Sequence, residues 1–225
     1  MNLQLTPTDW IALACFAAAW WGYPWYAQWH ARSTPSLNAL INVYRHQWMH
    51  QVLGREGRIV DSSILANLSN SATFFSSTTI LILGGLLALI DNAAPMLAAL
   101  GKIPYAQRMT AEIWEIKIIL MLLIFTYAFF KFTWSLRQFN FVSILVGATP
   151  AREGETAQQD ELATRAGRIL EHAGDSFSEG LRAYYFALAA LTWFVHPALF
   201  VLGTVWVVAI LYYLEFRSDT VRALL

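Results

Sequence analysis

The strongest constraint on this chain is an uncharged run from Ser62 to Ile90. It is long enough to cross a bilayer, since about 20 apolar residues suffice. On a helix, with residues about 100° apart, Ser, Thr and Asn side chains gather on one side of its first half. A polar side chain in hydrocarbon needs a protein or water partner. The run therefore predicts a transmembrane helix that packs inside a bundle or lines a wet cavity.

The composition is that of a membrane protein. Of 225 residues, 57% are apolar and 13% are charged, against about 25% charged in globular domains. The length fits a single transmembrane bundle over residues 1–225. The net charge of zero argues against nucleic acid as a partner. Cys15 is the only cysteine, which excludes an intramolecular disulfide.

Capping and stop signals mark three further helices. The segment Thr6–Asp9 begins a first span over Trp10–Trp29. Residues 36–53 form an amphipathic helix that is too polar to span and is expected on the membrane surface. The third long helix covers Glu112–Val146, because 147–150 is a stop signal.

A hydrophilic segment, 151–175, separates this helix from the last one. Its modest apolar stripe predicts a soluble cytoplasmic helical connector. Ser176 and Glu179 have the spacing of a capping box, so a new helix is expected to begin there.

The last apolar stretch, Ala183–Leu214, has two interpretations. His196-Pro197 is either a kink in one long helix or the turn between two short ones. The tyrosine pairs at 184–185 and 212–213 are about 42 Å apart on a helix, the depth of one bilayer with its headgroups. This favours one kinked helix and an all-α fold with four long transmembrane helices; five is the alternative.

Lys and Arg residues set the orientation. With four spans, all but five of the 15 fall on one side, which is therefore cytoplasmic. The five on the other side are Lys102, Arg108, Lys117, Arg217 and Arg222. The chain is thus expected to be a multi-pass protein of the inner (plasma) membrane with both termini outside, whereas five spans would move Arg217 and Arg222 inside.

Two groups of side chains are candidates for a functional site. Pore or cavity lining is expected from Asn67, Asn70, Phe74, Ser77 and Thr78, because hydroxyl and amide groups replace part of a solute's hydration. The spacing of seven from Ser63 to Gly84 also suits a helix-packing seam.

Anion or headgroup binding is expected from a second group at the cytoplasmic side, since arginine suits phosphate and carboxylate. Its members are Arg58, Asp61, Arg137 and Arg182. Positive-inside anchoring explains the same residues. Lys117 and Lys131 lie near the two membrane surfaces and are expected to snorkel.

His46 and His50 have the i, i+4 spacing of paired metal ligands, but no Cys or carboxylate cluster accompanies them. They are weak candidates for a metal or haem site, and no cofactor is expected. The chain has no catalytic motif, so enzymatic activity is not expected.

Several segments together resemble the domain of unknown function 599 family. The resemblance covers nearly the whole chain and implies a small helical membrane protein, without an established reaction, ligand or catalytic residue. The segments are RIVDS from Arg58, FFSSTTIL from Phe74, FFKFTWSLRQFNF from Phe129, GATP from Gly147, LRAYYFALAALTWFVHP from Leu181 and YLEFRS from Tyr213.

The leading functional hypothesis is a homo-oligomeric, channel-like conduit or solute-binding bundle with the polar second span innermost. The alternative is a non-conducting scaffold that docks a protein partner through its cytoplasmic helix ends. A histidine-based metal or haem site is the third.

Overall fold

The computed structural model describes residues 5–53, 55, 57–91, 93–100, 109–148 and 157–225, and its regular elements there are all helices. This confirms the all-α fold. The helices are α1 (Pro7–His30), α2 (Leu37–Leu53), α3 (Ile59–Asp91), α4 (Ala93–Leu100), α5 (Ala111–Ala148), α6 (Ala157–Thr192), α7 (Pro197–Phe216) and α8 (Asp219–Leu224).

Three helices are long and apolar enough to cross a membrane: α3, α5 and α7. Their spans are Ile59–Ile90, Ala111–Ala148 and Pro197–Leu224. The length and composition of these three helices thus support a membrane protein. They do not confirm the predicted number of four spans.

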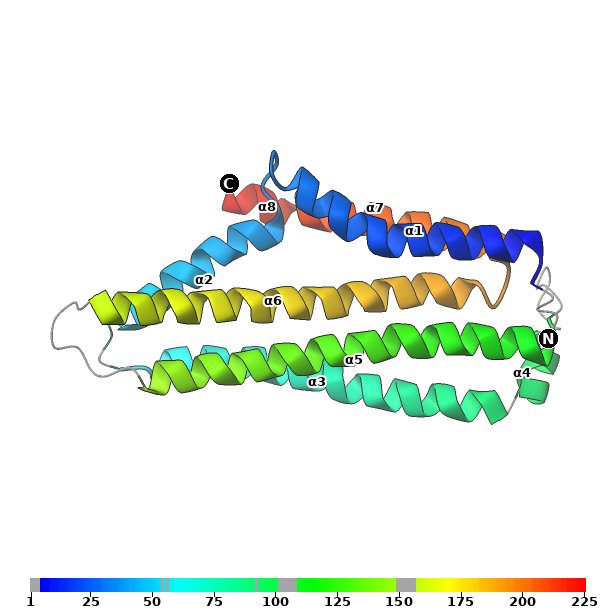
Figure 1. The fold of residues 1–225 in the computed structure, drawn as a ribbon, viewed down its shortest axis with the longest axis horizontal. Coiled ribbons are helices and arrows are strands. Elements are labelled where there is room, and N and C mark those ends of the chain that lie inside the picture. Colours follow the sequence, from blue (N-terminus) through cyan, green and yellow to red (C-terminus); the bar gives the residue numbers. More distant parts are fainter. Residues whose placement is uncertain (1–4, 54, 56, 92, 101–108, 149–156) are drawn as a thin grey trace.

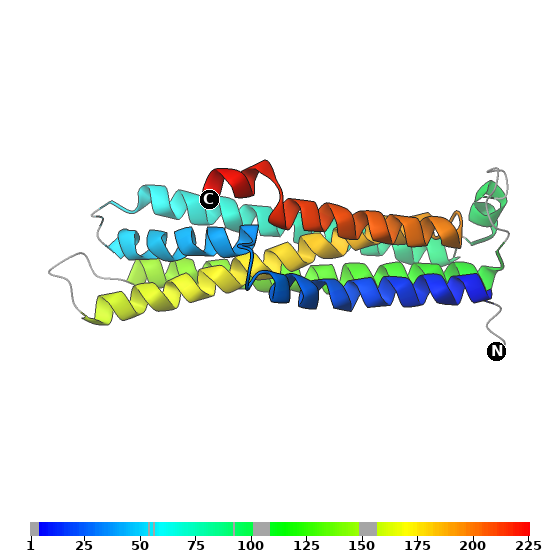
Figure 2. The same cartoon turned by 90° about the horizontal axis from the view of Figure 1, so that it is seen from above.

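The molecule is an elongated bundle in which α3, α5 and α6 run side by side along the whole length (Figure 1). At one end, α1 and α7 pack beside these three helices, and we call this the five-helix end. At the other end α2 takes their place, and we call this the four-helix end. The view from above shows the same division (Figure 2).

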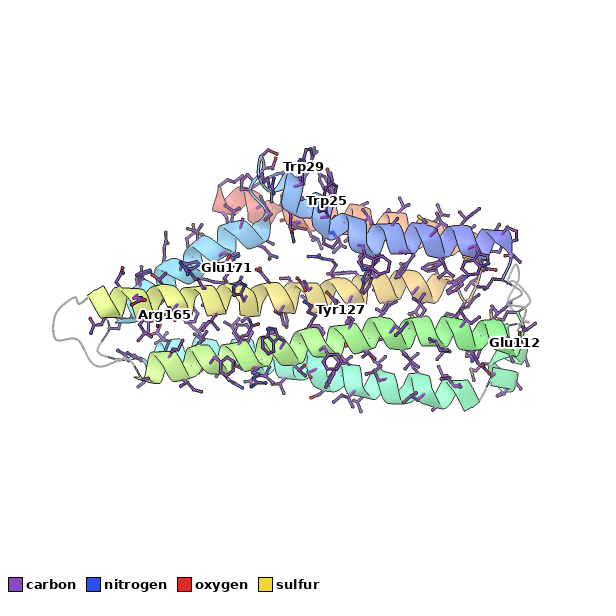
Figure 3. The ribbon with its side chains drawn as sticks, viewed as in Figure 1. Trp25, Trp29, Glu112, Tyr127, Arg165 and Glu171 are labelled. Carbon is purple, nitrogen blue, oxygen red and sulfur yellow. The ribbon has the colours of Figure 1, made fainter. Side chains whose placement is uncertain are left out.

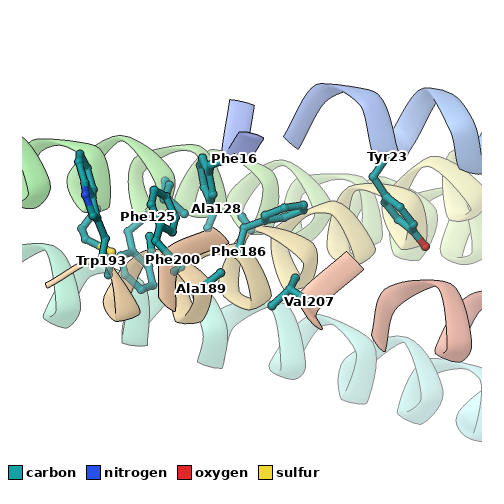
Figure 4. Packing of buried hydrophobic residues seen from close by; sticks show 14 of the residues in the cluster. Phe16, Tyr23, Phe125, Ala128, Phe186, Ala189, Trp193, Phe200 and Val207 are labelled. Carbon is teal, nitrogen blue, oxygen red and sulfur yellow. The ribbon is translucent and has the colours of Figure 1, made fainter. Parts of the chain in front are cut away.

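Aromatic side chains fill the five-helix end (Figure 4). The ring of Phe16 of α1 lies 5.0 Å from that of Phe200 of α7, tilted by 37°, and edge-on at 5.6 Å from that of Phe186 of α6. Trp193 is fully buried and stacks on Phe200 at 5.2 Å. Such large rings bridge α1 to α6, although the two backbones are not closely packed.

A second, smaller core lies in the four-helix end. Met49 and Val52 of α2 are each 1% exposed and pack with Leu65, Phe139 and Leu170 of the other three helices. Residues 37–53 form the helix predicted over 36–53, and its Met49 and Val52 pack inside this bundle while Val43 and Tyr44 are 54% and 50% exposed. Its location on a membrane surface stays a prediction.

The prediction of one kinked helix over Ala183–Leu214 is wrong. Helix α6 ends at Thr192, and α7 begins at Pro197 and returns along the bundle (Figure 1). His196 adopts an extended backbone, and its Nδ1 accepts a hydrogen bond from the Ala198 amide, which caps α7. As a result, the start of α1 and the end of α7 lie at opposite ends of the five-helix bundle. The expectation that both termini lie outside assumed a single final helix.

The predicted connector is also not a separate element. Residues 151–156 lie outside the described part of the chain, and from Ala157 the helix continues without a break to Thr192. Ser176 and Glu179 are therefore mid-helix residues and no capping box. Ser176 donates to Gln138 of α5, a contact that holds α6 against its neighbour.

Lys117 does not snorkel. It is 1% exposed, donates to the Trp193 carbonyl at 2.7 Å and lies 5.0 Å from that residue's ring. The Trp193 indole in turn donates to Asp9 at 2.8 Å, and Asp9 is 1% exposed. This buried polar layer joins α1, α5 and α6 near their ends, and the aromatic core separates it from the four-helix end.

Candidate functional site

A cleft of about 960 Å³ lies where α1, α2 and α6 diverge, at the boundary between the two ends of the molecule. The last turns of α1 form a mainly apolar wall with Pro24, Ala27 and Ala31. The opposite side is polar and belongs to α2 and α6, with Glu215 of α7 added. Its polar and charged members include Asn38, Asn42, His46, His50, Glu171, Asp175, Glu179, Arg182 and Glu215.

Polar contacts hold α2 against α6 along one side of the cleft. His46 Nε2 lies 2.9 Å from Glu171, and Asn42 donates to the same carboxylate at 3.0 Å. His50 Nδ1 lies 3.0 Å from Asp160. Figure 3 shows Glu171 on the side of α6 that faces α2. These contacts fix the α2 wall of the cleft.

Two glycines of α6 allow α2 to approach. A methyl group on Gly174 would lie 2.2 Å from the guanidinium carbon of Arg45. One on Gly167 would lie 2.5 Å from Nδ1 of His46. The absence of a Cβ at these positions therefore makes room for two basic side chains of α2 on the α6 surface.

The floor of the cleft consists of charged groups from three helices. Glu179 of α6 forms an ion pair with Lys131 of α5 and accepts a hydrogen bond from Tyr127 at 3.2 Å. Glu215 of α7 accepts one from Tyr23 of α1 at 2.7 Å. Arg182 and Glu179 also line a small cavity of about 30 Å³, large enough for a water molecule.

Arg182 differs from the other charged residues of the cleft. Its guanidinium lies over the ring of Tyr23, 5.7 Å from the centroid. Within the described part of the chain it has no ion-pair partner, in contrast to Lys131. A guanidinium with free donors in a cleft is a binding group for a carboxylate or phosphate.

Burial also changes the acidity of groups beside the cleft. Desolvation raises the pKa of Asp175, and the neighbouring carboxylate of Glu171 raises it further, while Arg45 opposes both. Desolvation lowers the pKa of Arg45, and the charges of Asp175 and Glu171 oppose this shift. The charged form of Asp175 is therefore held at a cost in free energy.

The predicted pore residues face outward in the single chain. Asn67, Asn70 and Ser77 are exposed, Phe74 is 64% exposed, and Thr78 is half-buried. They are not among the residues described as lining the cleft or the small cavity.

The inward side of α3 is polar at one level. Ser76 and Thr79 are buried there, and Thr79 Oγ1 lies 2.8 Å from the hydroxyl of Tyr184 on α6. Elsewhere on α3, hydroxyls donate to carbonyls four residues earlier, as Ser71 does to Asn67 and Thr73 to Ser69. Serine and threonine are thus satisfied by the helix itself, and their exposure does not require a pore.

The predicted cytoplasmic group does not come together around one site. Arg58 donates to the Val146 carbonyl at the end of α5. Asp61 is fully buried and accepts from Trp48 and Arg55. Arg137 is exposed over Trp134 and Phe141. Of these candidates, only Arg182 lines the cleft.

The histidine pair binds two different carboxylates, so His46 and His50 do not converge on one point. Among the residues the structure describes, no group of three or more His, Cys, Asp or Glu side chains is arranged to hold a metal ion.

The carboxylates of the cleft were not identified from the sequence. Glu171, Asp175, Glu179 and Arg182 follow at i, i+4, i+8 and i+11, which places them on one helical face. The spacing of Ser176 and Glu179 conceals this periodicity, because it resembles a capping box and predicts a helix boundary that separates Asp175 from Glu179.

An all-helical bundle with three helices of membrane-spanning length and hydropathy is typical of integral membrane proteins. The chain belongs to the DUF599 family of proteins of unknown function, whose sequence profile matches residues 11–220. This confirms the resemblance. No curated protein and no solved structure matches the chain.

Proposed function

We propose that the protein is a membrane-embedded binding protein whose site is the cleft between α1, α2 and α6. The observation that carries this proposal is the cleft itself, whose volume of about 960 Å³ lies within the range of ligand sites. Its lining combines an apolar wall with fixed polar groups, as such sites do.

The topology that accompanies this proposal has five crossings: α1, α3, α5, the second half of α6, and α7. The four-helix end and the cleft then face the cytoplasm, with the N-terminus outside and the C-terminus inside. This arrangement places all but three of the 15 Lys and Arg residues on the cytoplasmic side. The three exceptions are Lys102, Arg108 and Lys117. The charge asymmetry is stronger than with four spans, which supports five.

A cleft that opens to one side suits binding better than conduction by a single chain. Between the floor at Arg182 and the buried Lys117 lie aromatic side chains, including Phe16, Phe186 and Phe200. These rings provide no groups to replace the hydration of an ion.

The test is to purify the full chain in mild detergent and search for bound small molecules or lipids by native mass spectrometry. Ala39 is an exposed residue of α2 that lines the cleft, so Ala39→Trp fills it. We expect a bound mass on the wild type that Ala39→Trp loses. The control, Ala66→Trp on the exposed face of α3, is expected to keep it. A bare wild-type protein, or an adduct that both tryptophan variants keep, excludes the cleft as the site.

A second candidate is a homo-oligomeric conduit, favoured by the outward polar stripe of α3. In an oligomer whose axis is lined by α3, Asn67, Asn70 and Ser77 would face the axis and Phe74 would narrow it. Liposomes containing the protein would then release potassium or chloride, and Phe74→Ala would raise the rate. The absence of flux from wild type and from Ser77 and Phe74 variants excludes this candidate.

A further inference from the structure

The charges along the cleft are ordered. From the four-helix end to the five-helix end, α6 presents Glu171, Asp175 and Glu179 and then Arg182, over about 16 Å of helix. Glu215 of α7 adds a fourth carboxylate. The described lining thus contains four carboxylates, two histidines and a single guanidinium.

The carboxylates are held in position by the protein. Glu171 is fixed by Asn42 and His46, and Glu215 by Tyr23. Glu179 is fixed by Lys131 and Tyr127. Each oxygen pair keeps lone pairs free for a further donor. A row of oriented acceptors of this kind binds an ammonium group without the need to reorganise.

Neither a simple anion nor a simple amine suits this cleft as a whole. A free anion at Arg182 is repelled by the surrounding carboxylates. An amine satisfies the carboxylates but leaves the Arg182 guanidinium without an acceptor. Resting on the proposed binding function, we propose that the cleft binds a zwitterion, with its anionic group at Arg182 and its ammonium group among Glu179, Asp175 and Glu171.

The order of charges suggests the phosphate–ammonium chemistry of an ethanolamine phosphate. In the five-crossing topology, Arg182 is the charge nearest the hydrocarbon and the carboxylates lie farther into the cytoplasm. Trp25 and Trp29 lie in the last turns of α1, beside the cleft residues Pro24 and Gln28 (Figure 3). They are 74% and 60% exposed, as aromatic side chains at a membrane interface are. Two sources carry this chemistry: a phospholipid headgroup of the inner leaflet and free phosphoethanolamine.

The test is to titrate the purified full chain separately with phosphoethanolamine, inorganic phosphate and ethanolamine, and to measure each affinity by calorimetry. We expect phosphoethanolamine to bind at least tenfold more tightly than either half. Arg182→Gln is expected to reduce this affinity at least tenfold, and Arg182→Lys less, because lysine keeps the charge but not the planar fork. Arg137→Gln, an exposed arginine of α5, serves as the matched control and is expected to have no effect.

Asp175→Asn provides a second variant should Arg182→Gln not fold. It is expected to weaken phosphoethanolamine and ethanolamine but not phosphate. Equal affinities for phosphoethanolamine and one of its halves overturn the proposal, as does an Arg182→Gln variant that folds and binds like wild type.

The source is distinguished in nanodiscs of equal parts phosphatidylethanolamine and phosphatidylglycerol. A lipid ligand predicts that phosphatidylethanolamine is retained selectively on release into the mass spectrometer and that Ala39→Trp abolishes its retention. A free ligand predicts binding of phosphoethanolamine with no lipid preference. If Ala39→Trp removes an adduct that is neither phosphatidylethanolamine nor phosphoethanolamine, the zwitterion proposal is overturned and the proposed binding function stands. If the protein carries no adduct and phosphoethanolamine does not bind in the titration, both the zwitterion proposal and the proposed binding function are excluded.

Discussion

Several charged side chains of this protein are removed from solvent fully, as Lys117 and Asp9 are, or in part, as Asp175 is, and each has specific partners. Near the beginning of α5, Lys117 is buried against the Trp193 carbonyl and near Asp9. In the cleft, Asp175 lies near Arg45 and Glu171. A buried charge is tolerated only while its partners remain, so each of these residues has a measurable effect on stability.

Lys117→Ala removes the cation of the buried polar layer that Lys117 forms with Trp193 and Asp9. It leaves the buried Trp193 carbonyl without its donor and removes the cation near Asp9, which keeps the hydrogen bonds that Thr6 and Trp193 donate to it. We therefore expect a loss of about 1–3 kcal/mol in the free energy of unfolding. Denaturation of the protein in detergent measures this loss. Arg222→Ala, at an exposed ion pair, is the control and is expected to change stability by less than about 0.5 kcal/mol. Adding Asp9→Asn to Lys117→Ala should recover part of the loss, and a strictly additive double variant would contradict the coupling.

Asp175 predicts a dependence on pH. Its pKa in the folded chain lies above the ordinary value of 3.8, so the folded state binds the proton more tightly than the unfolded state. The free energy of unfolding therefore falls as pH rises from about 3.8 through the raised pKa. Asp175→Asn removes this fall and should gain in stability over wild type as pH increases.

Thermal unfolding of both proteins in detergent, between about pH 4 and pH 7, compares the two slopes. Parallel curves would refute the assignment to Asp175. Together with the weaker ligand binding expected of the same variant, a gain in stability would indicate that Asp175 is kept for function.

At the level of helices, close packing depends on where glycine is placed. A methyl group on Gly180 of α6 would lie 2.6 Å from Cε1 of Phe132, whose ring is fully buried and stacks on Phe75 at 5.1 Å. The same group on Gly84 of α3 would meet nothing within 4 Å. The two glycines therefore have opposite roles, although both lie within long helices.

Gly180→Ala forces Phe132 out of a packed cluster and is expected to destabilise the protein by about 1–3 kcal/mol. Gly84→Ala gains helix propensity without a clash and is expected to stabilise it by about 0.5–1 kcal/mol. Unfolding midpoints of the two variants, measured side by side, test this contrast. The prediction fails if both alanines shift the midpoint in the same direction.

The helices themselves were largely predictable, and their pairing was not. Hydropathy and capping located α1, α2, α3 and α5 within a few residues, because these signals are local. The same signals could not show that the chain folds back at Trp193–His196, since a proline is compatible with a kink and with a turn. The cleft depends on contacts such as His46 with Glu171, which no local pattern specifies. Arg182 was identified by its charge alone, without its neighbours.

At the level of the whole molecule, two bundles share three continuous helices. The five-helix end has an aromatic core and the four-helix end an aliphatic one, and Phe177 of α6 packs against both. The cleft lies at the step where α1 and α7 end and α2 begins (Figure 1).

The five-crossing topology predicts that the two termini lie on opposite sides of the membrane. A fluorescent protein that folds only in the cytoplasm, fused after Leu225, should fluoresce, and alkaline phosphatase fused there should be inactive. Fusions at the N-terminus should give the reverse. If the fusions at both termini give the same result, the number of crossings is even and the five-crossing topology is wrong.

Helix α6 continues through both bundles without an interruption between Ala157 and Thr192. An unbroken helix of this length is about 54 Å long and behaves as a stiff rod. A rotation of about 5° at one end displaces the other by about 5 Å. In the five-crossing topology proposed above, we therefore expect a change in the tilt of α6 within the bilayer, such as one caused by membrane thickness or tension, to be transmitted to its other end and to alter the width of the space between α2 and α1.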